Sequence, residues 1–288
     1  MLKRIAFSAF ILFVSLHYAS AQGDMVKRLT VLRPPEMSAI SIQNVKYKES
    51  AAKQALSMDV YYPAGIQRDT TYPTLVFVLG YPDSTMLRMI GTKLKDMGAY
   101  TSWARLVTSV GLIGINYETQ QPDVDLEDLL AYLQTNGASL KIDSKRIGFW
   151  SCSANVPTAI SALSQSAREN IKCAALLYGM MQTPDQKFQA QIDSLSEAVG
   201  FYSRQLEPIK QIRTDIPYFV VRAGRERFKG LNETIDHFVS QSTSLNAPIT
   251  LINYANGRHA FDIYDDNDES RYIIQQTLVW LQKNLAGR

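Results

Sequence analysis

Cysteine is nearly absent from this 288-residue sequence, since only Cys152 and Cys173 occur. Two cysteines are too few for the disulfide framework that stabilises small secreted modules. Cys152 is expected at the end of one strand and Cys173 near the start of the next, so their Cα atoms should lie too far apart to be bridged. We therefore expect two buried thiols.

An excess of charge is also lacking, because the chain has 30 Lys and Arg residues against 27 Asp and Glu. So small a net charge does not favour a polyanionic partner such as nucleic acid. No cluster at metal-ligand spacing and no phosphate-binding glycine loop occurs. The acidic run at residues 262–269 lacks the glycine and spacing of a calcium loop and is expected to be solvated. We expect no metal and no cofactor.

Long hydrophobic runs are missing too, since none reaches the about 20 residues that span a bilayer. The apolar run at residues 5–16 follows Lys3 and Arg4 and precedes Ala19-Ser20-Ala21. This order is typical of a secretory signal peptide with a small-residue cleavage site. We predict a signal peptide at residues 1–21 and a secreted or periplasmic mature chain that does not attach to a membrane after cleavage.

No linker, repeat or low-complexity tract divides residues 22–288, which are predicted to form a single domain. Strands are predicted from short runs rich in β-branched and aromatic residues. They cover residues 55–62, 74–79, 112–117, 146–150, 173–178, 218–222 and 249–254. Amphipathic spacing predicts helices at residues 94–110, 126–133, 156–163, 235–242 and 272–285.

Alternation of these strands and helices predicts an α/β fold with a mostly parallel sheet covered by helices on both faces. The first one or two strands follow each other without a helix and are predicted to be antiparallel. Residues 180–212 interrupt the alternation with a stretch rich in Gln, Ser and Glu. This insertion is either a lid over a site or a solvated pair of helices.

Ser153 stands where a buried strand runs into a turn and a helix, in the segment Trp-Ser-Cys-Ser-Ala-Asn. This context is typical of a nucleophile elbow, in which a strained turn exposes one hydroxyl above the sheet. The usual motif is G-x-S-x-G, but here Ser151 and Asn155 replace the two glycines. The motif is degenerate and needs support from the rest of the chain.

A serine nucleophile needs a neighbouring base, and the chain has three histidines. His17 lies in the predicted signal peptide, and His237 lies within an amphipathic helix. His259 follows the strand at residues 249–254, in the loop before the last helix. Ligands of open parallel sheets bind at this carboxyl edge of the strands. His259 is therefore the predicted general base.

The third member of a triad is an acid that orients the imidazole. Glu226 follows the strand at residues 218–222 and gives the chain order serine, acid, histidine, as in other hydrolases built on such a sheet. Arg225 and Arg227 flank it, so a surface ion pair is the alternative. Asp185, in the insertion, is the second candidate for the acid.

These residues resemble an α/β-hydrolase of the dienelactone hydrolase-like group, which also includes many secreted carboxylesterases. The resemblance covers about residues 57–285. It runs through Asp-Val-Tyr-Tyr-Pro (59–63), Phe-Val-Leu-Gly-Tyr-Pro (77–82), the elbow at Ser153, Tyr-Gly (178–179), Arg-Ala-Gly-Arg-Glu (222–226) and Gly-Arg-His-Ala-Phe (257–261).

The resemblance implies an eight-stranded sheet and a triad of Ser153, Glu226 and His259. The fold's oxyanion hole corresponds to the backbone N–H groups of Ala154 and Tyr81. The family's acid is usually Asp, so Glu226 requires a loop set back by about one methylene. Dienelactone hydrolase has a Cys nucleophile, but Cys152 lies one residue before that position, so its side chain should point into the core.

The leading hypothesis is a serine hydrolase that cleaves a small carboxylic ester through an acyl-enzyme. A secreted peptidase of the same fold is a second hypothesis, in which the insertion at residues 180–212 shapes a peptide cleft. A third is a catalytically inactive hydrolase-fold protein that binds a ligand, because the elbow glycines and the usual Asp are replaced.

Overall fold

The computed structural model describes residues 25–38, 40–49, 55–165, 168–182 and 209–286. The predicted signal peptide lies outside these residues, and so does most of the insertion, including Asp185. Among the described residues, no helix combines the length and the apolar character needed to cross a membrane.

One sheet of eight strands lies at the centre of the molecule, in the order β1-β2-β4-β3-β5-β6-β7-β8. The strands are β1 (Ser41–Glu49), β2 (Ala55–Tyr62), β3 (Tyr72–Phe77), β4 (Ile113–Tyr117), β5 (Ile142–Cys152), β6 (Ile171–Leu177), β7 (Tyr218–Arg225) and β8 (Ile249–Arg258). β1 pairs with β2 and β2 with β4 in antiparallel fashion, and all other pairs are parallel. The predicted mostly parallel sheet with an antiparallel start is confirmed.

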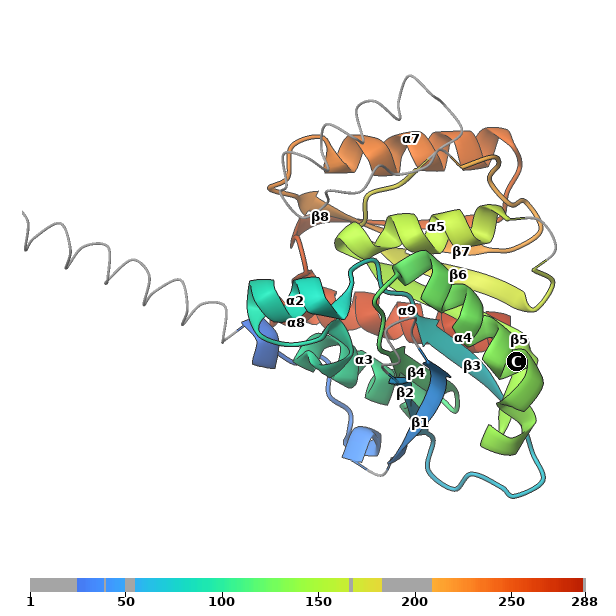
Figure 1. Ribbon diagram of the computed structural model, residues 1–288. Coiled ribbons are helices and arrows are strands. Elements are labelled where there is room, and N and C mark those ends of the chain that lie inside the picture. Colours follow the sequence, from blue (N-terminus) through green and yellow to red (C-terminus); the bar gives the residue numbers. More distant parts are fainter. Residues whose placement is uncertain (1–24, 39, 50–54, 166–167, 183–208, 287–288) are drawn as a thin grey trace, which may run out of the picture.

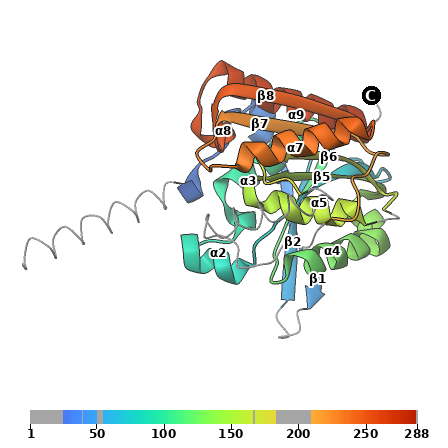
Figure 2. The same ribbon diagram turned by 90° about the horizontal axis from the view of Figure 1, so that it is seen from above.

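Helices cover both faces of the sheet, as Figures 1 and 2 show. α3 (Gly98–Ser109) and α9 (Asp268–Ala286) lie on one face, and α4 (Pro122–Asn136), α5 (Val156–Ser164) and α7 (Leu231–Ser244) lie on the other. The remaining helices are α2 (Asp83–Ile90) and α8 (Phe261–Tyr264), with the 3₁₀ turns η1 (Pro35–Ser38), η2 (Leu94–Asp96), η3 (Gly137–Leu140) and η4 (Ser153–Asn155).

The central strands are buried on both faces, which explains their nearly continuous hydrophobic sequences. Every residue of β4 is buried, and so is every residue of β3 after Tyr72. Close packing reaches the backbone at Gly148 in β5, where an added Cβ would lie 2.9 Å from Leu285 of α9 and 3.2 Å from Cys173 Sγ. The core therefore holds the carboxyl end of β5 in a fixed position.

Both cysteines carry free thiols, and the expected burial is found for Cys173, while Cys152 is partly buried. In the register of β5 and β6, Cys173 pairs with Gly148 and Cys152 pairs with Leu177, so the two lie at different heights in the sheet. Cys152 Sγ lies 3.7 Å from the hydroxyl of the buried Tyr100, on the core side. Burial raises the pKa of the Cys152 thiol to about 12. Cys152 is thus a poor nucleophile at neutral pH.

One predicted helix is divided in the structure, and one observed helix was not predicted. The helix expected at residues 94–110 is divided into η2 and α3 because Met97 has an extended backbone (φ −65°, ψ 142°). The N-terminal segment packs against the start of α3, where an added Cβ on Gly98 would lie 2.5 Å from the carbonyl oxygen of Arg28. The helix α2, eight residues that directly follow Pro82, was not predicted.

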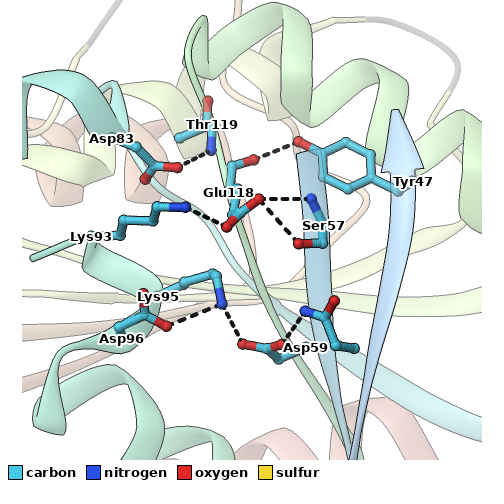
Figure 3. Close-up of polar contacts among 10 residues, drawn as sticks. Tyr47, Ser57, Asp59, Asp83, Lys93, Lys95, Asp96, Glu118 and Thr119 are labelled. Carbon is cyan, nitrogen blue, oxygen red and sulfur yellow. Dashed lines mark hydrogen bonds and ion pairs between the residues drawn. The ribbon is translucent and has the colours of Figure 1, made fainter. Parts of the chain in front are cut away.

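A layer of charged side chains joins β2 and β4 to η2 (Figure 3). Lys95 Nζ lies 2.7 Å from Asp59 and 3.0 Å from Asp96. The Glu118 carboxylate accepts hydrogen bonds from the backbone N–H and hydroxyl of Ser57, at 2.9 and 3.0 Å, and pairs with Lys93. These contacts fix the start of the loop after β4 beside β2 and η2.

Candidate active site

Ser153 lies at the junction of β5 and α5, at the carboxyl edge of the sheet. Its φ of +56° falls in the left-handed region, which non-glycine residues enter at a cost. Such a backbone turns the side chain out of the strand direction. The segment of residues 151–155, called the elbow below, has the strained conformation that the sequence predicted.

Gly179 provides the space behind the elbow. An added Cβ at this position would lie 2.1 Å from Val156 Cγ2 and 3.1 Å from the carbonyl oxygen of Ser153. The N–H of Met180 donates a hydrogen bond of 3.3 Å to that same oxygen. In this chain the tight packing normally associated with the motif glycines therefore falls on Gly179, the second residue after β6.

His259 lies next to Ser153 although 106 positions separate them in the sequence. The Ser153 Oγ to His259 Nε2 distance is 2.8 Å, which is a good hydrogen bond. Ala260 directly after it has a left-handed backbone (φ +58°), which ends the loop and starts α8. The side chain of His259 is 12% exposed, so a small reactant can reach it from one side.

Glu226 lies on the far side of the imidazole, with Oε2 2.5 Å from His259 Nδ1. Its second oxygen, Oε1, accepts a hydrogen bond of 2.9 Å from the backbone N–H of Phe228. The side chain is 2% exposed, so the flanking arginines do not make it a surface ion pair. The structure therefore brings the three predicted residues into one hydrogen-bonded row.

Two aromatic rings enclose the imidazole of His259. The ring centroid of Tyr178 lies 5.0 Å away and that of Phe228 lies 5.1 Å away, both with edge-on geometry. Tyr178 is buried and follows β6, while Phe228 follows Glu226. The two rings restrict rotation of the imidazole and keep its Nε2 directed to Ser153.

Asp262 contradicts the expectation that the acidic run at residues 262–269 is solvated. Its side chain is 1% exposed, and its oxygens accept hydrogen bonds of 2.7 Å from Trp103 Nε1 and 2.7 Å from the Tyr178 hydroxyl. Burial raises the pKa of Asp262. Asp262 holds the Tyr178 hydroxyl and so fixes the aromatic ring that contacts the imidazole of His259. The many acidic residues that follow Asp262 made its burial hard to predict from the sequence. The apolar neighbour Phe261 could have indicated it.

The predicted oxyanion residues also lie near the elbow. Ala154 follows Ser153 in η4, and Tyr81 lies in the loop of residues 78–82 between β3 and α2, called the β3–α2 loop below. A direct contact joins the two segments, because the Gly80 N–H donates a hydrogen bond of 2.7 Å to Asn155 Oδ1. Asn155, which replaces the second motif glycine, is therefore a hydrogen-bonded part of the site.

Nothing among the described residues indicates a metal centre, since they contain no group of three or more His, Cys, Asp or Glu side chains able to hold an ion. A cavity of about 600 Å³ lies elsewhere, at the edge of the sheet. It is lined by Arg225, Tyr254, Asn256, Arg258, Asp265, Asn267 and Glu269. Ser153 and His259 do not line it, so we do not assign it to the candidate active site. His237 is half-buried on α7, as its helical position predicted.

No protein-family model matches the sequence, and no curated protein matches it. Solved structures do match the fold. A hyperthermophilic esterase of the archaeon Pyrobaculum calidifontis is 13% identical with a TM-score of 0.65, over 93% of this chain and 90% of the esterase. A thermophilic esterase of the Planctomycetes species Thermogutta terrifontis is 15% identical with a TM-score of 0.61, over 88% of this chain and 95% of the esterase.

A third structure, an α/β-hydrolase enzyme from a Medee basin deep-sea metagenome library, is 14% identical with a TM-score of 0.62, over 86% of this chain and 99% of the other. Identities this low carry information about the fold alone. Together with the sheet order and the helices on both faces, the matches show that the chain has the α/β-hydrolase fold.

Proposed function

We propose that this protein is a serine hydrolase that cleaves a small carboxylic ester, with Ser153, His259 and Glu226 as its catalytic triad. The observation that carries the proposal is the row of two hydrogen bonds, 2.8 Å from Ser153 Oγ to His259 Nε2 and 2.5 Å from His259 Nδ1 to Glu226. Structural similarity to esterases favours this reaction over others of the fold.

In the first half of the reaction, Ser153 Oγ attacks the ester carbonyl carbon while its proton passes to His259 Nε2. The imidazolium that forms is stabilised by Glu226 across the Nδ1–H hydrogen bond. The carbonyl oxygen becomes an oxyanion, which the N–H groups of Ala154 and Tyr81 are proposed to stabilise. The tetrahedral intermediate then expels the alcohol, which takes the proton from Nε2.

In the second half, water attacks the acyl-enzyme while Nε2 accepts its proton. Collapse of the second tetrahedral intermediate breaks the bond between the acyl carbon and Ser153 Oγ, and Nε2 returns the proton to that oxygen. The products are an acid and an alcohol, and the reaction needs no cofactor. The two rings around His259 hold the base in place for both proton transfers.

The test is hydrolysis of p-nitrophenyl acetate and butyrate by the wild type and by Ser153→Ala. We expect Ser153→Ala to lose at least 10³-fold in kcat, since the nucleophile is gone. Ser164→Ala is the matched control, because among the described residues its hydroxyl donates to the Ser161 carbonyl oxygen, at 2.8 Å, at the end of α5 far from Ser153. Equal hydrolysis by the wild type and Ser153→Ala would contradict the proposal.

The same experiment separates the two alternatives. A peptidase would cleave peptide substrates in preference to esters with the same dependence on Ser153. An inactive binding protein would hydrolyse neither, and a fluorophosphonate probe would not label Ser153. The hydrogen bonds of both Glu226 oxygens favour a working triad over an inactive one.

We further propose that the mature protein starts at Gln22 and acts outside the cytoplasm, as a single domain of residues 22–288. The basic, apolar and small residues of positions 3–21 support this. Expression in a bacterial host with fractionation tests it, because the extracellular or periplasmic fraction should contain a chain with Gln22 at its N-terminus. A full-length chain in the cytoplasmic fraction would contradict it.

A further inference from the structure

The two residues that replace the motif glycines, Ser151 and Asn155, both contact the β3–α2 loop. Ser151 is fully buried, and its Oγ donates a hydrogen bond of 3.1 Å to the carbonyl oxygen of Val78. Asn155 is 5% exposed, and its Oδ1 accepts from the Gly80 N–H at 2.7 Å. Glycine could make neither contact, so the two replacements join the elbow to a loop more than 70 positions away in the sequence.

Both polar atoms of the Asn155 side-chain amide form hydrogen bonds. Its Nδ2 donates to the Tyr100 hydroxyl at 2.8 Å and to the carbonyl oxygen of Cys152 at 3.2 Å. These two acceptors determine which side of the amide faces Gly80, since only Oδ1 can accept from an N–H group. The Asn155 side chain is therefore held in one orientation by the core side of the elbow.

Three consecutive backbone N–H groups of the β3–α2 loop each have a hydrogen-bond acceptor. The Val78 N–H donates to the Trp150 carbonyl oxygen at 2.9 Å, and the Leu79 N–H donates to the Tyr117 hydroxyl at 3.2 Å. The Gly80 N–H donates to Asn155. Successive peptide planes are linked by only two soft dihedrals. Fixing these three peptide groups therefore restricts the next peptide group, which carries the Tyr81 N–H.

We infer that Asn155, with Ser151, is a positioning residue that holds the Tyr81 N–H at a fixed place relative to Ser153. The inference rests on the proposed function, in which Tyr81 donates to the oxyanion. Preorganised donors stabilise the transition state because they need no reorganisation during the reaction. With glycine at both elbow positions, neither residue would have a side chain to bond the β3–α2 loop. In this chain the elbow and the loop form one hydrogen-bonded unit.

The experiment compares Asn155→Ala with the wild type in ester hydrolysis and in amide hydrogen exchange. We expect kcat to fall 10- to 100-fold with KM within twofold, because the lost contact matters in the transition state rather than in substrate binding. Exchange in a peptide covering residues 78–82 should become at least tenfold faster. Ser151→Ala should show the same pattern with a smaller loss of about two- to fivefold, since the Val78 N–H keeps its own partner.

Ser164→Ala is the matched control, because it removes another buried side-chain hydrogen bond, at the far end of the helix that follows the elbow, and should change neither readout. Asn155→Gly restores the common motif residue and serves as the second variant should the alanine variant fold poorly. Unchanged exchange at residues 78–82, or a loss confined to KM, would overturn the inference.

The exchange measurement also separates this inference from the proposed function. If the wild type hydrolysed no ester and Ser153 were not labelled, the proposed function would fail. Faster exchange in Asn155→Ala would then support only the structural connection, and the role in positioning an oxyanion donor would be overturned with the reaction. If the wild type is active and exchange is unchanged, the inference alone fails.

Discussion

The carboxyl group of Glu226 lies 2.5 Å from His259 Nδ1, at the end of a side chain one methylene longer than that of an Asp. Its other oxygen accepts from the Phe228 N–H at 2.9 Å, within a turn of the same loop. The extra length is thus used to reach the imidazole while the local backbone holds the carboxylate. The acid is positioned by its own loop.

Shortening or neutralising this side chain should impair the reaction. We expect Glu226→Gln to lower kcat for p-nitrophenyl butyrate by about 10³- to 10⁴-fold, because the amide no longer stabilises the imidazolium and favours the wrong tautomer. Glu226→Asp should lose about 10- to 100-fold, since the shorter side chain cannot keep both contacts. Steady-state kinetics measures both.

Glu233→Gln is the matched control for Glu226→Gln, because Glu233 is exposed on α7. Its kcat should equal that of the wild type. Wild-type activity of Glu226→Gln would assign the acid to another residue, and Asp185 would then be the next to replace.

Removal of the buried carboxyl group of Asp262 should destabilise the protein. Asp262→Ala leaves Trp103 Nε1 and the Tyr178 hydroxyl without their acceptor, and we expect a loss of about 2–4 kcal/mol in the free energy of unfolding. Asp262→Asn should lose less than half as much, since its amide can accept from Trp103 and donate to the Tyr178 hydroxyl. Urea denaturation measures the difference.

Asp266→Ala is the control for this pair, because the side chain of Asp266 is 70% exposed and its change should stay within about 0.5 kcal/mol. Equal destabilisation by Asp262→Ala and Asp262→Asn would mean that the charge, and not the hydrogen bonding, carries the effect.

Substitutions at Gly179 and Val156 should have coupled effects on the free energy of unfolding. Gly179→Ala places a methyl group where Val156 Cγ2 lies at 2.1 Å, so we expect about 1–3 kcal/mol of destabilisation and lower activity from a displaced elbow. Val156→Ala removes the obstructing methyl groups. A double-mutant cycle should give a favourable interaction energy between the two changes, and simple additivity of the two losses would contradict the packing argument.

Asp83 should make stability depend on pH. Burial raises its pKa to about 7, and within the described residues its Oδ1 has no hydrogen-bond partner. Oδ2 accepts from the Thr119 N–H at 3.0 Å (Figure 3). Because the folded pKa lies above the unfolded one, the unfolded chain releases its proton first as pH rises, and the native state loses stability between about pH 4 and 7.

Asp83→Asn removes this titration while it keeps an oxygen for Thr119. We expect the variant to gain stability relative to the wild type as pH rises from 4 to 7, on the order of 2–4 kcal/mol, with no further change above pH 8. Urea denaturation of both proteins at pH 4.5, 6 and 8 measures the difference. A constant difference over this range would contradict a raised pKa of Asp83.

The pattern of the central strands made most of the fold predictable. β2, for example, covers the range that its alternation of apolar and polar residues indicated. β1 was not assigned a range because it is an edge strand with mostly exposed side chains, so its sequence Ser-Ile-Gln-Asn-Val-Lys-Tyr-Lys-Glu lacks the apolar pattern of a buried one. Edge strands carry a weak signal for this reason.

Predictability of the site followed the same logic. Ser153, Glu226 and His259 follow the ends of β5, β7 and β8, and chain order together with the carboxyl-edge rule placed them together. The contacts of Asn155 with Gly80, and of Asp262 with Trp103, join residues 75 and 159 positions apart. No local pattern encodes such pairs, because they depend on the final packing of the sheet and its helices.

The wide separation of the site residues bears on how the protein refolds. Ser153 and His259 meet across 106 positions, and they lie at the ends of β5 and β8, with two further parallel strands between these in the sheet. Non-local parallel pairing forms slowly because chain closure precedes its contacts. Trp103 and Trp150, whose rings lie 5.1 Å apart, report by fluorescence on the packing of α3 against β5. Labelling of Ser153 by a fluorophosphonate would report on the docking of β8 against the rest of the sheet, so the two signals together would follow two separate packing events during refolding.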